Sequence, residues 1–450
     1  MIVKNQIVNL TINSISSDGN GVGRFQGFAI FVPFTAIGDN CDVRIVKVNN
    51  SYAFGIIERL VKPSSSRIEV DCPFYKKCGG CNFRHISYED ELTIKENIVS
   101  EAVRRIGGID VNINPIVGAP SDKYYRNKVQ FPIVSNGNEL LPAFYQARSH
   151  RLVSIIDACK LQPILLNKIA VSACKILSRL NETAFDEEHS TGNIRHVLLK
   201  KSSLNDDVLL CVITFNGRVN NEKAFVSELV NEYPNVKTIV INKNKQRANT
   251  IISDEYRIIY GPGYIEDEIC GVPAKITYDS FFQINHESTE QLYNFIKEIA
   301  NVKKGENVID LYCGTGTIGL SCSTPETNLV GIEVVSRAIE SAKEAAERIG
   351  YKNAKFIKGD ASVISELLDT GFEPDVVITD PPRKGCSKEV LEAITESRVN
   401  QIIMVSCNPS TLARDLRYLV DKGYIVKSVT PFDLFPRTKH VETVCCLYHQ

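Results

Sequence analysis

The sequence lacks long hydrophobic runs and an excess of charge of either sign. No apolar run approaches about 18 residues, so the sequence predicts no membrane-spanning helix. The first five residues include no basic region followed by an apolar one, and we therefore expect a cytoplasmic protein. Because the formal net charge is only −1, there is no global basic field. A nucleic-acid partner must then meet a local basic surface, or bind with modest and salt-sensitive affinity.

The chain does have the length and the apolar content for several hydrophobic cores. It contains 450 residues, 43% of them hydrophobic, and this length favours about two to four domains. Its 14 cysteines include isolated positions in apolar segments, such as Cys211, and one tight group within residues 72–81. In a reducing compartment, such a group indicates metal binding or catalysis rather than disulfide bonds.

Hydrophobic periodicity divides the chain into three parts. Residues 1–62 alternate in short strands between glycine turns, which predicts a small OB-like β-barrel. Such a barrel is either a groove for single-stranded nucleic acid or a purely structural module. Residues 63–275 mix strands with helices, among them an amphipathic helix near 89–106. From 276 to 450 strands alternate with helices, which predicts a parallel, doubly wound sheet.

A glycine-rich loop follows the first strand of this C-terminal part. In residues 310–319 a strand runs into the loop and the loop into a helix, an arrangement in which glycines let a cofactor approach the backbone closely. Glu333, at the end of the next strand, suits a pair of ribose hydroxyls. Taken alone, this pattern fits NAD as well as S-adenosylmethionine.

Three later features favour a methyltransferase that acts on a nucleic-acid base. Residues 380–383, Asp-Pro-Pro-Arg, resemble the motif with which such enzymes border the substrate base, although two prolines can simply end a strand. Cys407 lies at the end of the next apolar run, where a cysteine is more often a small buried hydrophobe than a nucleophile. Glu442 begins the final strand, and its alternative role is a solvated edge carboxylate.

A cysteine and a carboxylate together suit methylation at carbon 5 of uracil. That carbon is too weakly nucleophilic to take a methyl group directly. A thiolate that adds at carbon 6 moves electron density to carbon 5, and a base must afterwards remove the carbon 5 proton. Cys407 and Glu442 fit these two roles, with the uracil held out of its stack.

Five stretches of the sequence closely resemble the bacterial RNA uracil-5 methyltransferases, particularly the iron–sulfur branch that acts on 23S ribosomal RNA. The stretches are residues 281–285, 310–319, 380–383, 406–415 and 440–443. The resemblance implies a multidomain α/β protein. Its implied parts are a TRAM β-barrel at 1–62, a central RNA-binding domain at 63–275 and a Rossmann-like catalytic domain at 276–450, with about 88–118 packed on the catalytic domain.

The same resemblance implies roles for individual residues. The implied cofactor is S-adenosylmethionine, and its contacts are Gln283, Tyr312, Glu333 and Asp380. Cys407 is the implied nucleophile, and Glu442 is the implied proton acceptor. Arg437 stands where many members of the family carry a histidine, so no histidine role transfers to that position.

Cys72, Cys78 and Cys81 form a C-x5-C-x2-C group. Three cysteines at this spacing suggest a soft-metal site, but the spacing permits either zinc or an iron–sulfur cluster and leaves the fourth ligand open. By the resemblance, Cys159 is the fourth ligand of a [4Fe-4S] cluster. Unliganded surface thiols are the alternative.

The implied partner is RNA, and the resemblance implies 23S ribosomal RNA because the transfer-RNA branch characteristically lacks the barrel and the cysteine group. Three alternatives stay open: the same chemistry on transfer RNA, an amino-group methyltransferase, and a non-catalytic RNA-binding factor. Residues 124–128 mix aromatic, cationic and amide side chains, which fits either a single-stranded RNA contact or an ordinary strand start. We expect a monomer.

Overall fold

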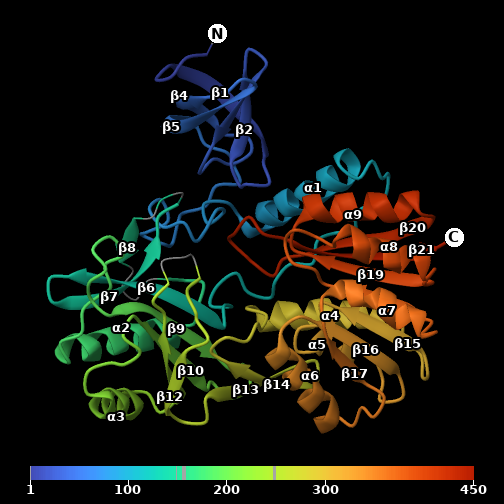
Figure 1. The fold of residues 1–450 in the computed structure, drawn as a ribbon. Helices are drawn as coiled ribbons and strands as arrows, with labels where there is room; N and C mark the ends of the chain where they lie inside the picture. The colour runs from blue at the N-terminus through green and yellow to red at the C-terminus, as the bar shows by residue number, and fades with distance from the viewer. Residues whose placement is uncertain (1, 148, 150, 155–158, 247–249) are drawn as a thin grey trace.

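The computed structural model describes residues 2–147, 149, 151–154, 159–246 and 250–450. Across this part of the chain the strands form a closed barrel, a seven-stranded central sheet, a two-stranded ribbon and a seven-stranded C-terminal sheet. Figure 1 shows the barrel at the top, the central sheet at the lower left and the C-terminal sheet at the right. None of the described helices is long and apolar enough to cross a membrane. The predicted multidomain α/β fold is confirmed.

The N-terminal barrel consists of β1 (Ile7–Ile15), β2 (Gly21–Phe25), β3 (Phe28–Val32), β4 (Asn40–Val48) and β5 (Tyr52–Lys62). Buried and exposed residues alternate along β1, because successive side chains of a strand point to opposite faces. The strands approach closely where glycine replaces a side chain: a Cβ at Gly55 would lie 2.2 Å from Cγ1 of Val43. The barrel predicted from the sequence is therefore present, with a small apolar core of its own.

Helix α1 (Tyr88–Arg105) follows the barrel in the sequence but packs against the C-terminal sheet. Its N-cap, Ser87, accepts a hydrogen bond from the Asp90 backbone N–H, and its last turn is basic, which suits the helix dipole. Val99 and Val103 belong to the apolar core of the C-terminal sheet. The residues that follow α1 run along that sheet, since Asn114 N donates to Val429 O at 2.9 Å.

The central sheet has the strand order β12-β11-β10-β9-β6-β7-β8. Its strands are β6 (Lys128–Asn136), β7 (Glu139–Tyr145), β8 (Leu152–Ser154), β9 (Ile194–Lys201), β10 (Val208–Thr214), β11 (Val236–Lys243) and β12 (Tyr256–Tyr260). Side chains of β10 alternate between two cores: Leu210 and Val212 pack with α2 (Ile164–Arg179) and α3 (Glu222–Glu232), whereas Leu209 and Cys211 face the opposite way. Both faces are covered, which explains the unbroken apolar run of this strand.

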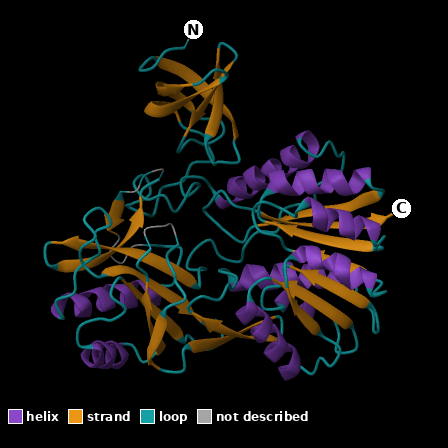
Figure 2. Ribbon diagram, viewed as in Figure 1, coloured by secondary structure: helices purple, strands orange, loops and turns teal. Residues whose placement is uncertain are grey.

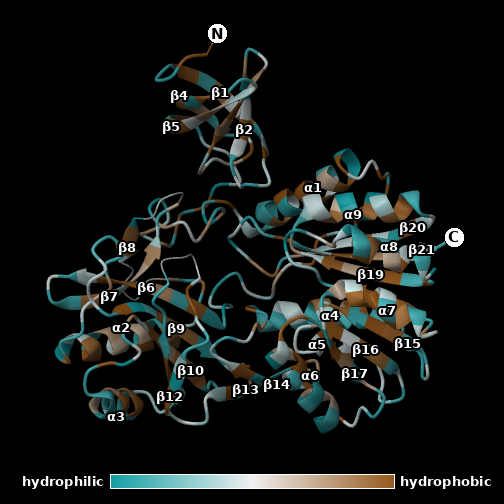
Figure 3. Cartoon of the chain, in the orientation of Figure 1, coloured by the Kyte–Doolittle hydropathy of each residue, from teal (hydrophilic) through white to brown (hydrophobic). Residues whose placement is uncertain are grey.

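The ribbon β13 (Tyr264–Ile269) and β14 (Val272–Thr277) connects the central sheet to the C-terminal sheet. The strands of the latter are β15 (Asn307–Leu311), β16 (Asn328–Glu333), β17 (Lys355–Lys358), β18 (Val376–Thr379), β19 (Gln401–Ser406), β20 (Tyr424–Phe432) and β21 (Glu442–His449). Its helices are α4 (His286–Ala300), α5 (Thr317–Cys322), α6 (Ser336–Arg348), α7 (Ile364–Asp369), α8 (Lys388–Glu396) and α9 (Pro409–Asp421), with the 3-10 turn η1 (Ala361–Val363). Figure 2 shows helices on both faces of this sheet, and in Figure 3 the hydrophobic colour follows its strands.

The order of the C-terminal sheet is β17-β16-β15-β18-β19-β21-β20. Its first five strands are parallel, as predicted for a doubly wound sheet. The last strand differs from that prediction, because β21 runs antiparallel to both β19 and β20. The chain reaches the edge of the sheet with β20 and returns through residues 433–441, so β21 inserts between its two neighbours in the opposite direction.

A buried ion network fixes the returning segment to α1. The side chains of Lys95, Glu91 and Asp433 are fully buried. Lys95 Nζ donates to Glu91 Oε1 and to Asp433 Oδ1, each at 2.7 Å, and to the carbonyl of Phe435 at 3.2 Å. A buried ammonium needs such partners, since desolvation would otherwise make its charge very costly.

Arg437 extends the network to Ile86 and Asp122. Its backbone N–H donates to Glu91 Oε1 at 2.7 Å, its Nη1 donates to Ile86 O at 2.7 Å, and its guanidinium pairs with Asp122. Arg437 adopts a left-handed backbone conformation with φ 68°, which a non-glycine residue keeps only when its surroundings hold it there. Residues 433–441 are therefore held in one path between β20 and β21.

Replacement of Lys95 tests this network. Lys95→Met leaves Glu91 and Asp433 buried without their cation, and we expect the free energy of unfolding to fall by about 3–5 kcal/mol. The matched control is Lys388→Met, because Lys388 forms an ion pair with Glu392 at the same four-residue spacing but on the surface. We expect Lys388→Met to have the same free energy of unfolding as the wild type. Denaturant titrations of the wild type and both variants measure these free energies. Equal stability of the two variants would contradict the assigned importance of the buried network.

Candidate active site

The topology brings most of the predicted site residues to one edge of the C-terminal sheet. Tyr312, Asp380 and Cys407 directly follow β15, β18 and β19, whose carboxyl ends meet there because the strands are parallel. Glu333 ends β16, and Glu442 begins the reversed strand β21, so both lie at this same edge. The order of the strands reverses beside β15, and ligands of open α/β sheets bind at such a position.

Strand register places Cys407 and Glu442 opposite each other. Ser406 pairs with Thr443 in the antiparallel β19–β21 ladder, so the next positions outward are Cys407 and Glu442. Directly opposite residues in such a pair have their side chains on the same face of the sheet. Cys407 is half-buried, whereas Glu442 is buried with 7% of its surface exposed. The reversed strand therefore brings this cysteine and this carboxylate together.

Electrostatics keeps the resting thiol protonated. Burial raises the pKa of the Cys407 thiol to about 11, and the nearby carboxylates of Glu442 and Asp380 add to this rise, which Arg383 partly opposes. Burial, together with Asp380, raises the pKa of Glu442 to about 8. Burial also raises the pKa of Asp380 to about 6. Three acidic groups thus share a poorly solvated edge, and each disfavours the ionisation of its neighbours.

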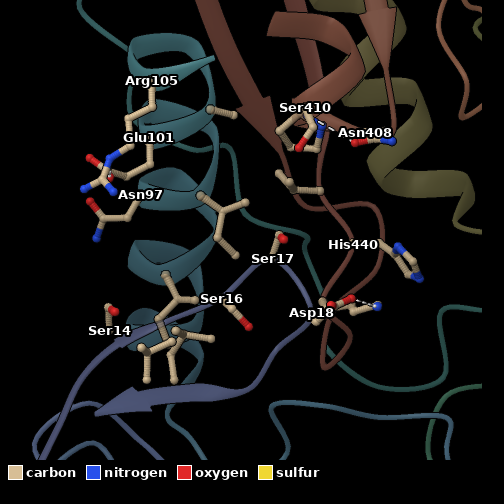
Figure 4. Close-up of a pocket in the computed structure, with 18 of the residues that line it drawn as sticks. Ser14, Ser16, Ser17, Asp18, Asn97, Glu101, Arg105, Asn408, Ser410 and His440 are labelled. Carbon is tan, nitrogen blue, oxygen red and sulfur yellow. Dashed lines mark hydrogen bonds and ion pairs between the residues drawn. The ribbon is translucent and has the colours of Figure 1, made fainter. Parts of the chain in front are cut away.

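A cavity of about 740 Å³ opens at Cys407. Its walls come from three parts of the chain: residues 13–18 of the barrel, one side of α1, and the loops around Cys407 and His440. Figure 4 shows Asn97, Glu101 and Arg105 of α1 along one wall, with Ser14, Ser16, Ser17, Asp18, Asn408, Ser410 and His440 around the rest. A ligand in this cavity would touch the barrel and α1 while it reached the thiol.

The glycine loop and Glu333 form the neighbouring half of the site. Glu333 Oε2 accepts a hydrogen bond from Gly314 N at 3.2 Å, and its Oε1 accepts one from Val335 N at 2.9 Å. These contacts hold the carboxylate beside the loop. Tyr312, which begins the loop, has a φ of 61°, so the chain turns sharply as it leaves β15. Gln283 forms a side-chain hydrogen bond with Tyr293 of α4, and its carbonyl accepts one from Asn127 Nδ2 at 2.8 Å.

Asp310 is a site residue that the sequence prediction missed. One of its oxygens, Oδ2, accepts a hydrogen bond from Gly319 N at 2.9 Å, whereas Oδ1 is buried and has no partner among the described residues. Burial raises the pKa of this carboxyl to about 7. The unused oxygen and the acidic surroundings fit a cationic ligand with a hydrogen-bond donor, and the ammonium of S-adenosylmethionine is such a group. In the sequence, the position of Asp310 near the end of a strand, just before the glycine loop, could have indicated this residue.

The four predicted cluster cysteines lie around one cavity. Cys72, Cys78, Cys81 and Cys159 all line a space of about 380 Å³. Within the described ranges, however, no group of three or more His, Cys, Asp or Glu side chains is arranged to hold a metal ion. The structure thus brings the predicted ligands together without showing a formed metal site.

The segment 124–128 makes internal contacts, which disfavours its predicted role as an RNA contact. The hydroxyl of Tyr125 donates to Pro436 O at 2.9 Å, and Asn127 N donates to Ile284 O at 2.9 Å. Arg126 lines the cysteine cavity. In this segment Tyr124 is exposed, at 37% of its surface. The strand-start interpretation therefore describes these residues better.

Comparison with known proteins identifies the family. The family model described as tRNA (Uracil-5-)-methyltransferase matches residues 87–450, and the TRAM domain model matches residues 4–57. The chain belongs to the tRNA (uracil-5-)-methyltransferase family. As a member of it, the protein is an S-adenosylmethionine-dependent RNA (uracil-5-)-methyltransferase with a TRAM domain. The predicted enzyme class, S-adenosylmethionine as cofactor and RNA as the type of partner are confirmed.

Similar proteins cover nearly the whole of this methyltransferase. One from Oceanobacillus iheyensis, named as an uncharacterized RNA methyltransferase, is 38% identical over 98% of this chain and 96% of its own. One from Clostridium tetani with the same description is 37% identical over 98% and 96%. Among solved structures, the Pyrococcus abyssi tRNA (uracil-54, C5)-methyltransferase in complex with S-adenosyl-L-homocysteine has a TM-score of 0.77 at 24% identity, and the match covers 98% of this chain and all of that one. This last likeness shows the shared fold.

The electrostatics of the site predicts how Cys407 reacts. Since its pKa is about 11, alkylation by iodoacetamide should accelerate about tenfold per pH unit from pH 7 to 10. Glu442→Gln should speed this alkylation above about pH 8, because the wild-type carboxylate is ionised there and opposes the thiolate. Mass spectrometry of the Cys407 peptide measures the rate.

Cys270 is the internal reference for this experiment. Burial raises its pKa to about 11 as well, and its neighbouring carboxylate is Glu290. Glu442→Gln should leave Cys270 unchanged, and Glu290→Gln should accelerate Cys270 alone. If Cys407 of Glu442→Gln were alkylated at the wild-type rate at pH 9, the two side chains would not be electrostatically coupled.

Proposed function

We propose that the protein methylates carbon 5 of a uridine in RNA through a covalent bond between Cys407 and carbon 6 of the base. The observation that carries this proposal is the register of β21, which sets Glu442 opposite Cys407, a residue that lines the cavity between the barrel and α1. An amino-group methyltransferase would give this pair no role, and a non-catalytic RNA-binding factor would need neither residue.

The proposed reaction uses two side chains in sequence. Cys407 loses its proton to solvent water and its sulfur bonds to carbon 6, while the carbon 5–carbon 6 π electrons move toward carbon 5 and oxygen 4. When bound, S-adenosylmethionine supplies a methyl group that carbon 5 can take. Glu442 as carboxylate then removes the carbon 5 proton, the double bond forms again, and the bond between sulfur and carbon 6 breaks. A base with a pKa of about 8 suits proton removal near neutral pH.

Four residues are proposed to hold the cofactor: Gln283, Tyr312, Glu333 and Asp380. Glu333, whose carboxylate accepts a hydrogen bond from the glycine loop, would bind the ribose hydroxyls. Asp380 lies near the reacting thiol and would face the cationic end of the cofactor, together with Asp310. Tyr312 and Gln283 lie at the mouth of the same loop and at the start of α4, respectively.

Two substitutions test the covalent mechanism. Cys407→Ala should abolish methylation yet bind S-adenosylmethionine with wild-type affinity in calorimetry, because the thiol acts only on the base. Glu442→Gln should transfer the methyl group but release product slowly, so a protein–RNA adduct should persist on a denaturing gel. The double variant should form no adduct, and Cys270→Ala should behave as wild type. Methyl transfer at a near-normal rate by Cys407→Ala would exclude the covalent route.

We further propose that Cys72, Cys78, Cys81 and Cys159 bind a [4Fe-4S] cluster with a structural role. Two cationic side chains on the wall of the cavity, Arg84 and Arg126, support this. Arg84 Nη2 and Arg126 Nε are buried and have no hydrogen-bond partner within the described chain. Unused donors on buried cations favour an anionic occupant, and a cluster held by four thiolates is one.

Purification without oxygen tests this assignment. The protein should be brown and contain iron and sulfide in equal amounts, and Cys159→Ser should lose the iron. Cys174→Ser is the control, because Cys174 is buried within α2, away from the cavity lining. Stoichiometric zinc in the wild-type protein, or an iron content that Cys159→Ser leaves unchanged, would rule out the proposed cluster.

We propose 23S ribosomal RNA as the substrate, with the protein acting as a cytoplasmic monomer. The sequence resemblance supports this substrate, and 14 free cysteines fit a reducing compartment. Transfer RNA is the second candidate, and a specific observation favours it. The Pyrococcus abyssi enzyme, which is titled as acting on tRNA, matches this chain from end to end, so the barrel by itself does not distinguish the two substrates.

Parallel methylation assays on the two RNAs decide between them. The protein is incubated with radiolabelled S-adenosylmethionine and either deproteinised 23S RNA or unmodified transfer RNA. We expect label mainly in a hairpin loop of 23S RNA, where an unpaired uridine is extruded at little cost, and we expect less label as salt rises. Label mainly in transfer RNA would retain the chemistry and reject this substrate.

A further inference from the structure

Asn82, the residue after the third cysteine of the cysteine cavity, contacts the segment that leads to Glu442. Its backbone N–H donates to Arg437 O at 2.8 Å, and its Oδ1 accepts a hydrogen bond from Lys439 N at 3.1 Å. The carbonyl of Asn82 accepts a hydrogen bond from the hydroxyl of Tyr75 at 2.5 Å, and Tyr75 lines the cysteine cavity. A single half-buried residue therefore joins the wall of that cavity to the returning segment.

The contact with Asn82 lies close to the proposed proton acceptor along the chain. The three residues before Glu442, from Lys439 on, line the cavity at Cys407. The side chain of Lys439 pairs with Asp18 of the barrel at 2.8 Å, while its backbone N–H is bound by Asn82. The position of Asn82 therefore bears on the carboxylate three residues further on, which lies opposite Cys407.

The loop that carries Asn82 has little regular structure of its own. Residues 63–87, all of which the structure describes, form no helix and no strand beyond isolated bridges. After Asn82, Phe83 is fully buried and packs with Ile94 of α1. Before it, Cys81 lines the cysteine cavity. One neighbour of Asn82 is thus fixed by apolar packing, and the other depends on what the cavity holds, since metal binding orders the chain around its ligands.

We propose that Asn82 is a positioning residue, which makes the place of Glu442 depend on whether the cysteine cavity is filled. This inference rests on the proposed cluster and on the proposed role of Glu442, and it gives the contact between the two regions a function. A cluster bound by Cys81 fixes the residue before Asn82, as Phe83 fixes the residue after it. An empty cavity removes the first of these constraints, so the contact with Lys439 loosens and Glu442 leaves its place beside the thiol.

The cofactor half of the site is held from a different wall of the cysteine cavity. Ile284 lines that wall, and its carbonyl accepts a hydrogen bond from Asn127 N at 2.9 Å. The side chain of Asn127 donates to Gln283 O at 2.8 Å. These contacts do not involve Asn82. A substitution of Asn82 should therefore change the pair of Cys407 and its carboxylate without changing the affinity for S-adenosylmethionine.

Alkylation of Cys407 by iodoacetamide at pH 9 tests the role of Asn82 without any RNA. Asn82→Ala removes the acceptor for Lys439 N, so the Glu442 carboxylate should move away from the thiol and the rate should rise about fivefold. Glu442→Gln should raise the rate to the same extent, and the two substitutions together should raise it no further. Asn82→Asp keeps an oxygen acceptor and should restore the wild-type rate.

The matched control is Asn205→Ala. Asn205 Oδ1 also accepts a hydrogen bond from a backbone N–H at 3.1 Å, that of Asp207, but in an exposed turn of the central sheet. This variant should leave the Cys407 rate unchanged, and Asn82→Ala should keep the iron content of the wild type. A wild-type rate in Asn82→Ala, an additive effect in the double variant, or loss of iron from Asn82→Ala overturns the positioning role.

Removal of iron from the wild-type protein tests the dependence on the cavity. After treatment with ferricyanide and a chelator, the peptide that contains residues 433–441 should exchange its amide hydrogens about tenfold faster, and alkylation of Cys407 should accelerate as in Asn82→Ala. Unchanged exchange and alkylation after the loss of iron overturn this dependence, and so does a wild-type protein that holds no iron as purified without oxygen.

Kinetics separates this inference from the proposed chemistry. With substrate RNA, Asn82→Ala should lower kcat about tenfold, leave KM unchanged and accumulate the protein–RNA adduct expected of Glu442→Gln. A raised KM with an unchanged kcat contradicts the positioning of Glu442. Failure of the wild-type protein to methylate any RNA overturns the proposed function instead, because the alkylation and exchange measurements need no methyl transfer.

Discussion

The buried contact between Lys95 and the carboxylates of Glu91 and Asp433 is the constraint on which the arrangement of this protein depends. It joins a helix from the first quarter of the chain to the segment that enters the final strand. Ion pairs of this kind add little net stability compared with apolar packing, but a mispaired alternative leaves a bare charge in the core. The network therefore selects one path for residues 433–441, and that path sets where β21 begins.

The position of β21 in turn decides the geometry of the site. Had the last strand joined the edge of the sheet in parallel, Glu442 would lie at the opposite end from Cys407. The antiparallel return places the carboxylate and the thiol in neighbouring register. Helix α1 also forms a wall of the cavity at Cys407, so the element that fixes the returning segment also shapes that cavity.

Burial and the acidic groups at this edge of the sheet explain why the Cys407 thiol stays protonated in the free protein. Burial raises the pKa values of Asp310, Asp380 and Glu442, because few polar partners surround them. Under the proposed assignment, a cationic cofactor would relieve this crowding of acids. A thiol with a pKa of about 11 is also protected from oxidation and alkylation, since the thiolate is the reactive form. Arg383, which lowers the pKa of Cys407 and lines the same cavity, is the opposing charge.

The sequence by itself determined the barrel, the doubly wound sheet and most of the candidate residues, since these depend on local patterns. Alternation of apolar residues defines strands, and glycine loops and strand ends mark where a cofactor and a nucleophile belong. The tertiary structure alone decided three matters that depend on contacts distant in sequence. These are the reversal of β21 opposite Cys407, the oxygen of Asp310 that has no partner among the described residues, and the internal contacts of Tyr125 and Arg126. No local pattern carries such information, because register, burial and cavity walls arise only when separate segments pack together.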